Sequence, residues 1–165
     1  MVDATILLLQ QRQPDEITVR DVAEASGHHH RFVQAWFGGK VGLFRAVFDH
    51  MTQAAAGDLR GPSAPQEGFV PGARVIAGLM NWLMAAGPDS LAGPRAMPIV
   101  ERLTEVYRQD FGFEPELARL MALRVVSASV SVLLFGGPLG VDSDDVNALA
   151  VLELTQLLAA SRNAH

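Results

Sequence analysis

The side chains best suited to bind a metal or an anion are concentrated near the start of the chain. They are three consecutive imidazoles and three cationic groups: His28, His29, His30, Arg20, Arg31 and Lys40. Imidazoles can bind metals, whereas cationic groups bind phosphates and the edges of nucleic-acid bases. Two kinds of site therefore have to be weighed, a metal centre and an anion-binding surface.

The histidine run does not favour a metal centre. Adjacent residues of a helix project about 100° apart, so three in a row cannot easily converge on one ion. A zinc site on a helix would need i,i+4 spacing or distant ligands. We expect these imidazoles to be solvated or to face a partner; a pH-sensitive phosphate contact is the second interpretation and a metal the third. We expect no bound metal and no cofactor.

Local signals around this stretch predict two short helices joined by a tight turn. Thr18 is placed to cap a helix over 19–26, with Asp21 completing a capping box. Gly27 supplies the left-handed turn that ends this helix. A second helix over 29–36 follows at once, which is the arrangement of a helix-turn-helix.

The apolar residues of the second helix decide which side chains it exposes. Val33 and Phe37 lie four residues apart and should pack inward. This turns four polar side chains outward: His29, His30, Arg31 and Gln34. Lys40 lies in the first turn of the next helix, where a cation opposes the helix dipole. A phosphate bound at that helix end would remove the conflict.

The composition and the positions of the Pro and Gly residues indicate an all-α globular protein. The 165 residues carry 13 Lys+Arg against 18 Asp+Glu, a net charge of −5, with 49% hydrophobic residues and no Cys. This excludes a disulfide scaffold and a cysteine nucleophile, and it argues against coating nucleic acid by charge alone. Pro and Gly clusters divide the chain into eight predicted helices, with ends uncertain by about 2–4 residues: 2–12, 19–26, 29–36, 40–56, 72–86, 97–110, 115–136 and 143–161.

The longest uncharged stretch, 125–141, is shorter than the roughly 20 residues that a bilayer requires. Gly136-Gly137-Pro138 interrupts it, so we expect a buried helix that ends there. The start of the chain has no basic region typical of a secretory signal. We therefore expect a cytoplasmic protein without a membrane partner.

The front of the chain resembles a known family. The run 17–27 (ITVRDVAEASG), then 37–40 (FGGK), then Leu43-Phe44, is similar to the DNA-binding domain of TetR-family transcriptional regulators. The match covers about Met1 to Met51, roughly a third of the chain.

The resemblance implies an all-helical dimer with a three-helix DNA-binding module at 1–48 and an effector-binding and dimerisation domain at 49–165. The function implied is a sequence-specific DNA-binding regulator, a repressor released or modulated by a small apolar effector. The DNA-contacting positions carried over are Thr18, Arg20, His29, His30, Arg31, Gln34 and Lys40.

Several positions depart from the family's pattern. His28 replaces a small branched residue, Phe32 a small or hydroxyl residue, and Gln34 a Tyr; no basic arm precedes the first helix in this sequence. Residues 18–45 hold four cations against two carboxylates, a balance of only +2. We therefore expect weak, salt-sensitive binding. The alternative is a dimeric helical interaction or adaptor protein whose degenerate helix-turn-helix has lost DNA binding.

The rear of the chain predicts a dimer interface and an effector region. The helix from Glu116 to Phe135 is apolar on most faces. Together with the helix at 143–161 it predicts a four-helix interface between two copies of the chain. The two copies would then bind one double-stranded DNA operator together. A monomer core is the alternative. Six large apolar residues mark the effector region, unless they are plain core: Met80, Trp82, Met84, Met97, Tyr107 and Phe111. No motif of an enzyme is visible.

Overall fold

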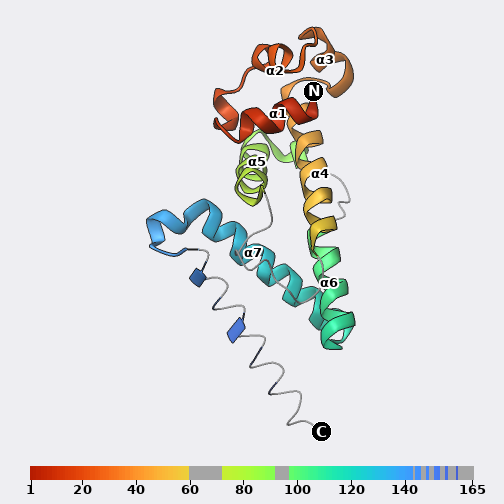
Figure 1. Cartoon of the computed structure of the whole chain (residues 1–165), viewed down its shortest axis with the longest axis vertical. Helices are drawn as coiled ribbons and strands as arrows, with labels where there is room; N and C mark the ends of the chain where they lie inside the picture. Colours follow the sequence, from red (N-terminus) through yellow and green to blue (C-terminus); the bar gives the residue numbers. More distant parts are fainter. Residues whose placement is uncertain are drawn as a thin grey trace. The chain divides into compact units, whose positions relative to one another are not determined.

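The computed structural model describes residues 1–59, 72–91 and 97–142, together with isolated positions beyond them: Asp144, Asp145, Ala148, Val151, Leu152, Thr155 and Ala159. Within these residues the regular structure is helical throughout, which confirms the all-α prediction (Figure 1). The elements are α1 Val2–Leu9, α2 Val19–Ser26, α3 Arg31–Phe37, α4 Lys40–Asp58, α5 Ala73–Ala85, α6 Pro98–Phe111 and α7 Pro115–Leu139, with 3-10 turns at Pro14–Glu16 and Pro88–Leu91.

The chain divides into two compact units. The first, called the head unit here, contains Met1–Asp58 and Pro71–Ile99; the second, the tail unit, contains Leu59–Val70 and Val100–His165. The boundary predicted between residues 48 and 49 falls inside α4. That helix continues without a break because its buried positions do not stop there: Thr52, Ala55 and Ala56 are buried as well.

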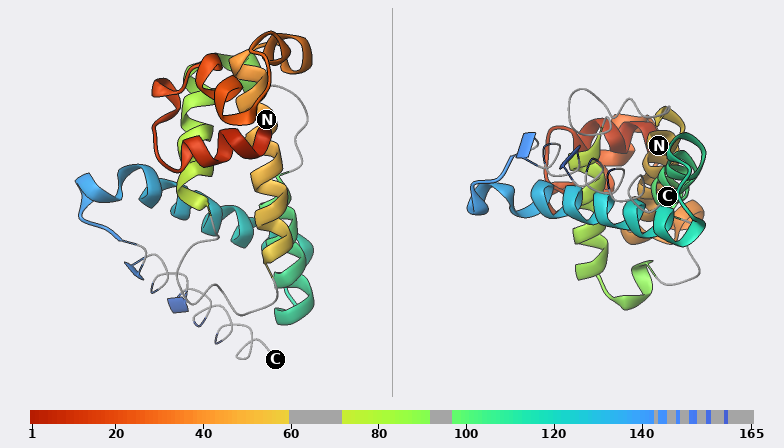
Figure 2. Two further views of the ribbon diagram at one scale, coloured as in Figure 1. Left: turned by 45° about the horizontal axis from the view of Figure 1, so that its top comes forward. Right: turned by 90° about the horizontal axis from the view of Figure 1, so that it is seen from below.

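The core of the head unit forms where α4 meets the shorter helices. Helices α1, α3 and α5 all contact α4, and the left view of Figure 2 shows α5 next to it. The core residues with the least exposure come from every part of the unit: Ile17, Val22, Val33, Leu43, Phe44, Val47, Leu79 and Leu83. Burial of these side chains fixes the short helices, because α2 and α3 are too short to be stable alone.

The start of α2 is capped as the sequence predicts. The hydroxyl of Thr18 accepts a hydrogen bond from the Asp21 amide at 3.2 Å, and the Asp21 carboxylate accepts one from the Thr18 amide at 2.7 Å. These hydrogen bonds, with a smaller contribution from Arg12, hold the pKa of Asp21 below its ordinary 3.8. Because folding lowers the pKa of Asp21, these hydrogen bonds stabilise the folded protein fully above the ordinary pKa of 3.8. The stabilisation is lost as the pH falls through the lowered pKa of the folded state.

Two helix boundaries in the head unit differ from the predictions. Helix α1 ends at Leu9, before position 12, because Pro14 opens a separate 3-10 turn that Gln13 and Glu16 cap reciprocally. Helix α3 begins at Arg31 and not at position 29, since the amide of Arg31 donates to Nδ1 of His29 at 3.2 Å. The predicted glycine ends are confirmed for α2, where Gly27 has a φ of 67°.

In the tail unit, α7 continues beyond the end predicted at position 136. It passes through Gly136 and Pro138 and ends at Leu139, with Gly140 in the left-handed conformation at φ 64°. The amide of Val141 donates to the Gly136 carbonyl at 3.0 Å, which satisfies an otherwise open helix end. The helix predicted at 143–161 lies largely outside the described residues.

Among the described residues, α7 is long and apolar enough to cross a membrane by length and composition. Core helices of soluble proteins meet the same criterion, so this feature alone assigns no location. Much of the helix is exposed in a single chain, in contrast to the burial expected from its sequence; Leu120, Phe135 and Leu139 are 52%, 55% and 67% exposed.

The capping box makes the first testable prediction. Thr18→Ala removes the acceptor for the Asp21 amide and should lower the free energy of unfolding by about 1 kcal/mol, measured by urea denaturation. Thr18→Ser keeps the hydroxyl and should lose far less. An unfolding midpoint for Thr18→Ala equal to that of the wild type would contradict the assigned cap.

Candidate nucleic-acid interface

The outer surface of the helix-turn-helix gathers most of the predicted DNA-contacting residues. Six of them are exposed, on α2, on the connecting turn and on α3: Thr18, Arg20, His29, His30, Arg31 and Gln34. Val33 is fully buried beneath them, as predicted, while Phe37 is half-buried. The prediction that burial of Val33 turns the polar side chains outward is therefore confirmed; their contact with DNA stays a prediction.

An open depression lies between α2 and the turn. Its volume is about 390 Å³, and it is lined by Arg20, Ala23, Glu24 and the turn residues 27–30. The depression thus brings together an arginine and two of the predicted histidines, His29 and His30. It also contains the carboxylate-bearing Glu24, which sequence reasoning did not place in the site and which opposes an anion there.

The three histidines are engaged in separate local contacts. Nδ1 of His28 lies 2.7 Å from the Ser26 carbonyl, and its ring meets the Trp36 indole edge-on at 5.5 Å. The rings of His29 and His30 lie 4.2 Å apart, centroid to centroid. The described residues contain no group of three or more His, Cys, Asp or Glu side chains placed to hold a metal ion.

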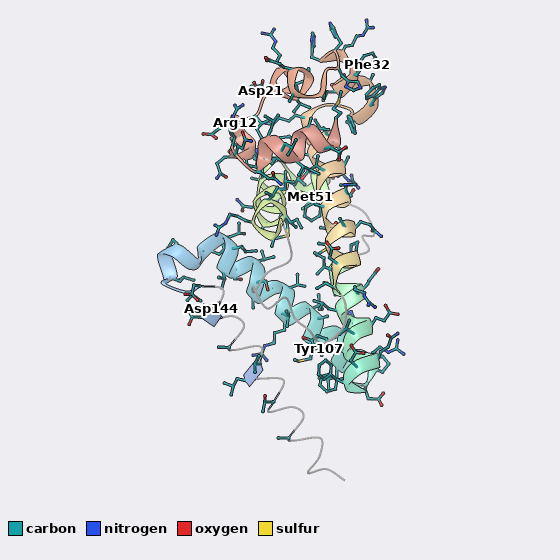
Figure 3. The ribbon with its side chains drawn as sticks, viewed as in Figure 1. Arg12, Asp21, Phe32, Met51, Tyr107 and Asp144 are labelled. Carbon is teal, nitrogen blue, oxygen red and sulfur yellow. The ribbon has the colours of Figure 1, made fainter. Side chains whose placement is uncertain are left out.

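Helix α3 also carries an aromatic pair that sequence reasoning did not place in the site. The rings of Phe32 and Trp36 stack at 4.8 Å with an interplanar angle of 16°, and the Arg31 guanidinium lies 5.1 Å from the centre of the Phe32 ring. Trp36 is 56% exposed, and the labelled Phe32 lies at the end of the head unit in Figure 3. Their i,i+4 spacing, on the side of α3 away from Gln34, is the signal that could have identified them.

Lys40 has a different environment from the other predicted contacts. It is half-buried, its Nζ donates to the Pro14 carbonyl at 2.7 Å, and the same Nζ lies 5.1 Å from the ring centres of Phe44 and Trp82. Burial lowers the pKa of Lys40, and the nearby carboxylate of Asp15 partly offsets this. The ammonium group is thus already held within the head unit, and its contact with a phosphate stays a prediction.

Trp82 links α5 to the residues around Lys40. Its Nε1 donates to the Asp15 carboxylate at 2.6 Å, and its ring lies 4.9 Å from that of Phe44. We call Pro14, Asp15, Lys40, Phe44 and Trp82 the Lys40 cluster. Through this cluster α5 contacts both the turn after α1 and the first turns of α4.

The six residues predicted to bind an effector are divided between the two units. Met80, Trp82, Met84 and Met97 belong to the head unit; Met84 and Met97 are exposed. Tyr107 and Phe111 belong to the tail unit, where their rings meet that of Phe113 at distances near 6 Å. A depression of about 320 Å³ beside Phe113 is lined by Glu105, Arg108 and Gln109 among others, and by none of the six. The effector site stays a prediction.

Comparison with solved structures decides the fold. The crystal structure of AlkX, a TetR-family repressor from Dietzia sp. implicated in biodegradation of n-alkanes, matches with a TM-score of 0.58. The match covers 94% of this chain and 92% of AlkX, at 22% sequence identity. The chain has the fold of a TetR-family repressor. No family model and no curated relative matches the chain.

Helix α3 is the second helix of this helix-turn-helix. In proteins that bind DNA through this motif, the second helix enters the major groove. The resemblance seen in the sequence is thus confirmed at the level of the fold. The residues that α3 exposes, and not the fold, decide what the surface can bind.

The Lys40 cluster makes the second testable prediction. Trp82→Ala removes a half-buried indole and its bond to Asp15, and should lower the free energy of unfolding by about 2 kcal/mol, since fully buried tryptophans contribute more. Met84→Ala, on the same helix at 56% exposure, is the control and should change it by less than about 0.5 kcal/mol. Both are measured by urea denaturation. Equal losses for the two variants would contradict the cluster.

Proposed function

We propose that this protein is a double-stranded DNA-binding transcriptional regulator that acts as a repressor. One observation carries the proposal: a capped helix, a left-handed glycine turn and a second helix expose Arg31 and Gln34 together, on the fold of a TetR-family repressor. This is the geometry with which helix-turn-helix proteins present side chains to base edges.

The local charge supports a polyanionic partner. The chain as a whole carries −5, yet residues 25–48 contain no Asp or Glu and include three cations, Arg31, Lys40 and Arg45. A protein of net negative charge that keeps one carboxylate-free stretch across α3 and the start of α4 is suited to approach phosphates there. The balance is small, so we expect binding to weaken steeply with salt.

The exposed side chains have distinct roles in this proposal. Arg31 can donate two hydrogen bonds to guanine, and Gln34 can bind adenine through its amide. Thr18 and Arg20 lie on α2, where contacts position a protein on the phosphate backbone. His29 and His30 in the turn donate to a phosphate or to a purine nitrogen.

The tail unit supports a homodimer. The large apolar side chains that α7 leaves exposed, Leu117, Leu120, Phe135 and Leu139, share an arc of roughly 100° on a helix with 3.6 residues per turn. Ser131 lies within this arc, and its hydroxyl donates to the Ser127 carbonyl at 2.9 Å, so it presents a small surface to a neighbour. The exposed cation Arg124 also falls within this arc, so the stripe is apolar on either side of a mixed centre. Exposed apolar surface of this kind on a helix is typical of helix pairing.

The proposed effector is a small apolar molecule. Its support is the mixture of methionine and aromatic side chains on α5 and α6, residue types that line adaptable apolar sites. The solved AlkX repressor is implicated in biodegradation of n-alkanes, which are apolar molecules. An effector acts by favouring one arrangement of the two heads over another.

One observation favours the alternative, a helical interaction protein without DNA binding. Lys40, which the resemblance assigns to a phosphate, donates to the Pro14 carbonyl and lies beside two rings. If Lys40 keeps its contact with Pro14, the DNA-facing surface has one cation fewer, and its excess of positive charge is already small.

Binding of the full chain to the DNA flanking its own gene tests the proposed function. In a gel shift, Arg31→Ala should lose about 1–3 kcal/mol of discrimination between cognate and altered sequences, because it removes a base contact. Lys40→Ala should weaken all sequences alike. Arg74→Ala, an exposed cation on α5, is the charge-matched control and should change neither. Absence of any shift at low salt would overturn the proposal and favour the interaction protein.

The dimer has its own test. Phe135→Glu places a charge in the apolar stripe of α7, with no basic residue three or four positions away, and should shift the protein to monomers in sedimentation equilibrium, because burial of an unpaired charge is costly. Arg119→Glu introduces the same side chain about 160° away around the helix and should leave the dimer intact. A wild-type protein that sediments as a monomer would contradict the interface.

A further inference from the structure

The aromatic pair on α3 is the feature of the head unit that the proposed roles do not use. Phe32 and Trp36 stack with one another, His28 lies against the edge of Trp36, and Arg31 lies beside Phe32. More than half of the Trp36 surface is exposed, at 56%. A large indole left in water on a helix of seven residues indicates a surface that is covered when the protein functions.

The surroundings of the pair select the kind of molecule that covers it. The carboxylate-free stretch 25–48 contains the pair, and the exposed cation beside it on α3 is Arg31. A cation beside a flat apolar surface is complementary to a nucleic acid, which offers phosphates and bases together. An acidic or purely apolar partner would not use both.

The geometry points to thymine as the base that this pair contacts: the exposed faces of Phe32 and Trp36 pack against the C5-methyl group of thymine in the major groove. Thymine is the one natural base of DNA that presents an apolar group on that edge, whereas the others present donors and acceptors. Apart from the indole N–H of Trp36, the two rings offer apolar surface, so their faces favour the methyl group over the polar edges. This inference rests on the proposed DNA-binding function and names one base that it recognises.

The pair also complements the neighbouring polar residues. Arg31 and Gln34 can recognise guanine and adenine by hydrogen bonds, but no polar side chain recognises a methyl group. Phe32 and Trp36 lie four residues apart and therefore on one side of α3, so both can contact the same short step of DNA. The recognised sequence should contain thymine next to the base read by Arg31.

Replacement of thymidine by deoxyuridine tests the inference, because it removes only the methyl group and keeps base pairing. Duplexes are first selected from a random library by the full chain, then resynthesised with single substitutions. For each contacted methyl we expect about fourfold weaker binding, the fold-change that corresponds to about 0.8 kcal/mol for one buried carbon group. The double variant Phe32→Ala/Trp36→Ala should bind both duplexes equally. Leu7→Ala, exposed to 59% on α1, is the control and should keep the fourfold preference.

The outcomes separate the two proposals. If the wild type binds selected duplexes but prefers no thymidine to deoxyuridine, the thymine contact is overturned while the proposed function stands. If the double variant Phe32→Ala/Trp36→Ala retains the preference, another residue makes the contact and the inference is again overturned. Tighter binding to single strands than to duplexes would assign the pair to base stacking and overturn it too. If no duplex is selected at all, the proposed function itself fails, and the inference fails with it.

Discussion

The burial of Val33 is the constraint on which the exposed surface of the head unit depends. Helix α3 has seven residues, and Val33 is the one that it buries completely. A helix of this length is unstable alone, so its packing on α4 sets its orientation as well as its stability. Once Val33 points inward, the positions around it are turned to solvent. The cations, the histidines and the aromatic pair are therefore exposed together because a single apolar side chain is buried.

Local physics made much of the head unit predictable from the sequence, and long-range packing set the rest. Thr18, Asp21 and Gly27 act over a few residues, so the start and end of α2 could be predicted. The bond from Trp82 to Asp15 joins residues 67 positions apart, and nothing in either neighbourhood indicates it. The sequence predicted an effector contact for Trp82, which stays a prediction, and did not predict its contact with the turn after α1.

Lys40 shows how one sequence signal can have two physical solutions. A lysine in the first turn of α4 opposes the helix dipole, and the sequence argument resolved this with a phosphate. The structure offers an internal resolution, in which the ammonium donates to the Pro14 carbonyl and lies beside the electron-rich faces of Phe44 and Trp82. An ammonium has three donors, so the Pro14 bond leaves capacity for a phosphate. The Lys40 cluster raises the free-energy cost of a phosphate contact, because that contact competes with the partly buried packing of the ammonium group.

The weak positive charge of the helix-turn-helix segment and the apolar stripe of α7 are parts of one physical requirement. A balance of +2 over residues 18–45 provides few phosphate contacts, and affinity for DNA depends strongly on their number. Joining two such heads converts the second binding event into an intramolecular one, which raises the overall affinity without adding any charge. An exposed stripe of Leu120, Phe135 and Leu139 would be a liability in a monomer. In a dimer the same stripe supplies the second head that a weakly cationic surface needs.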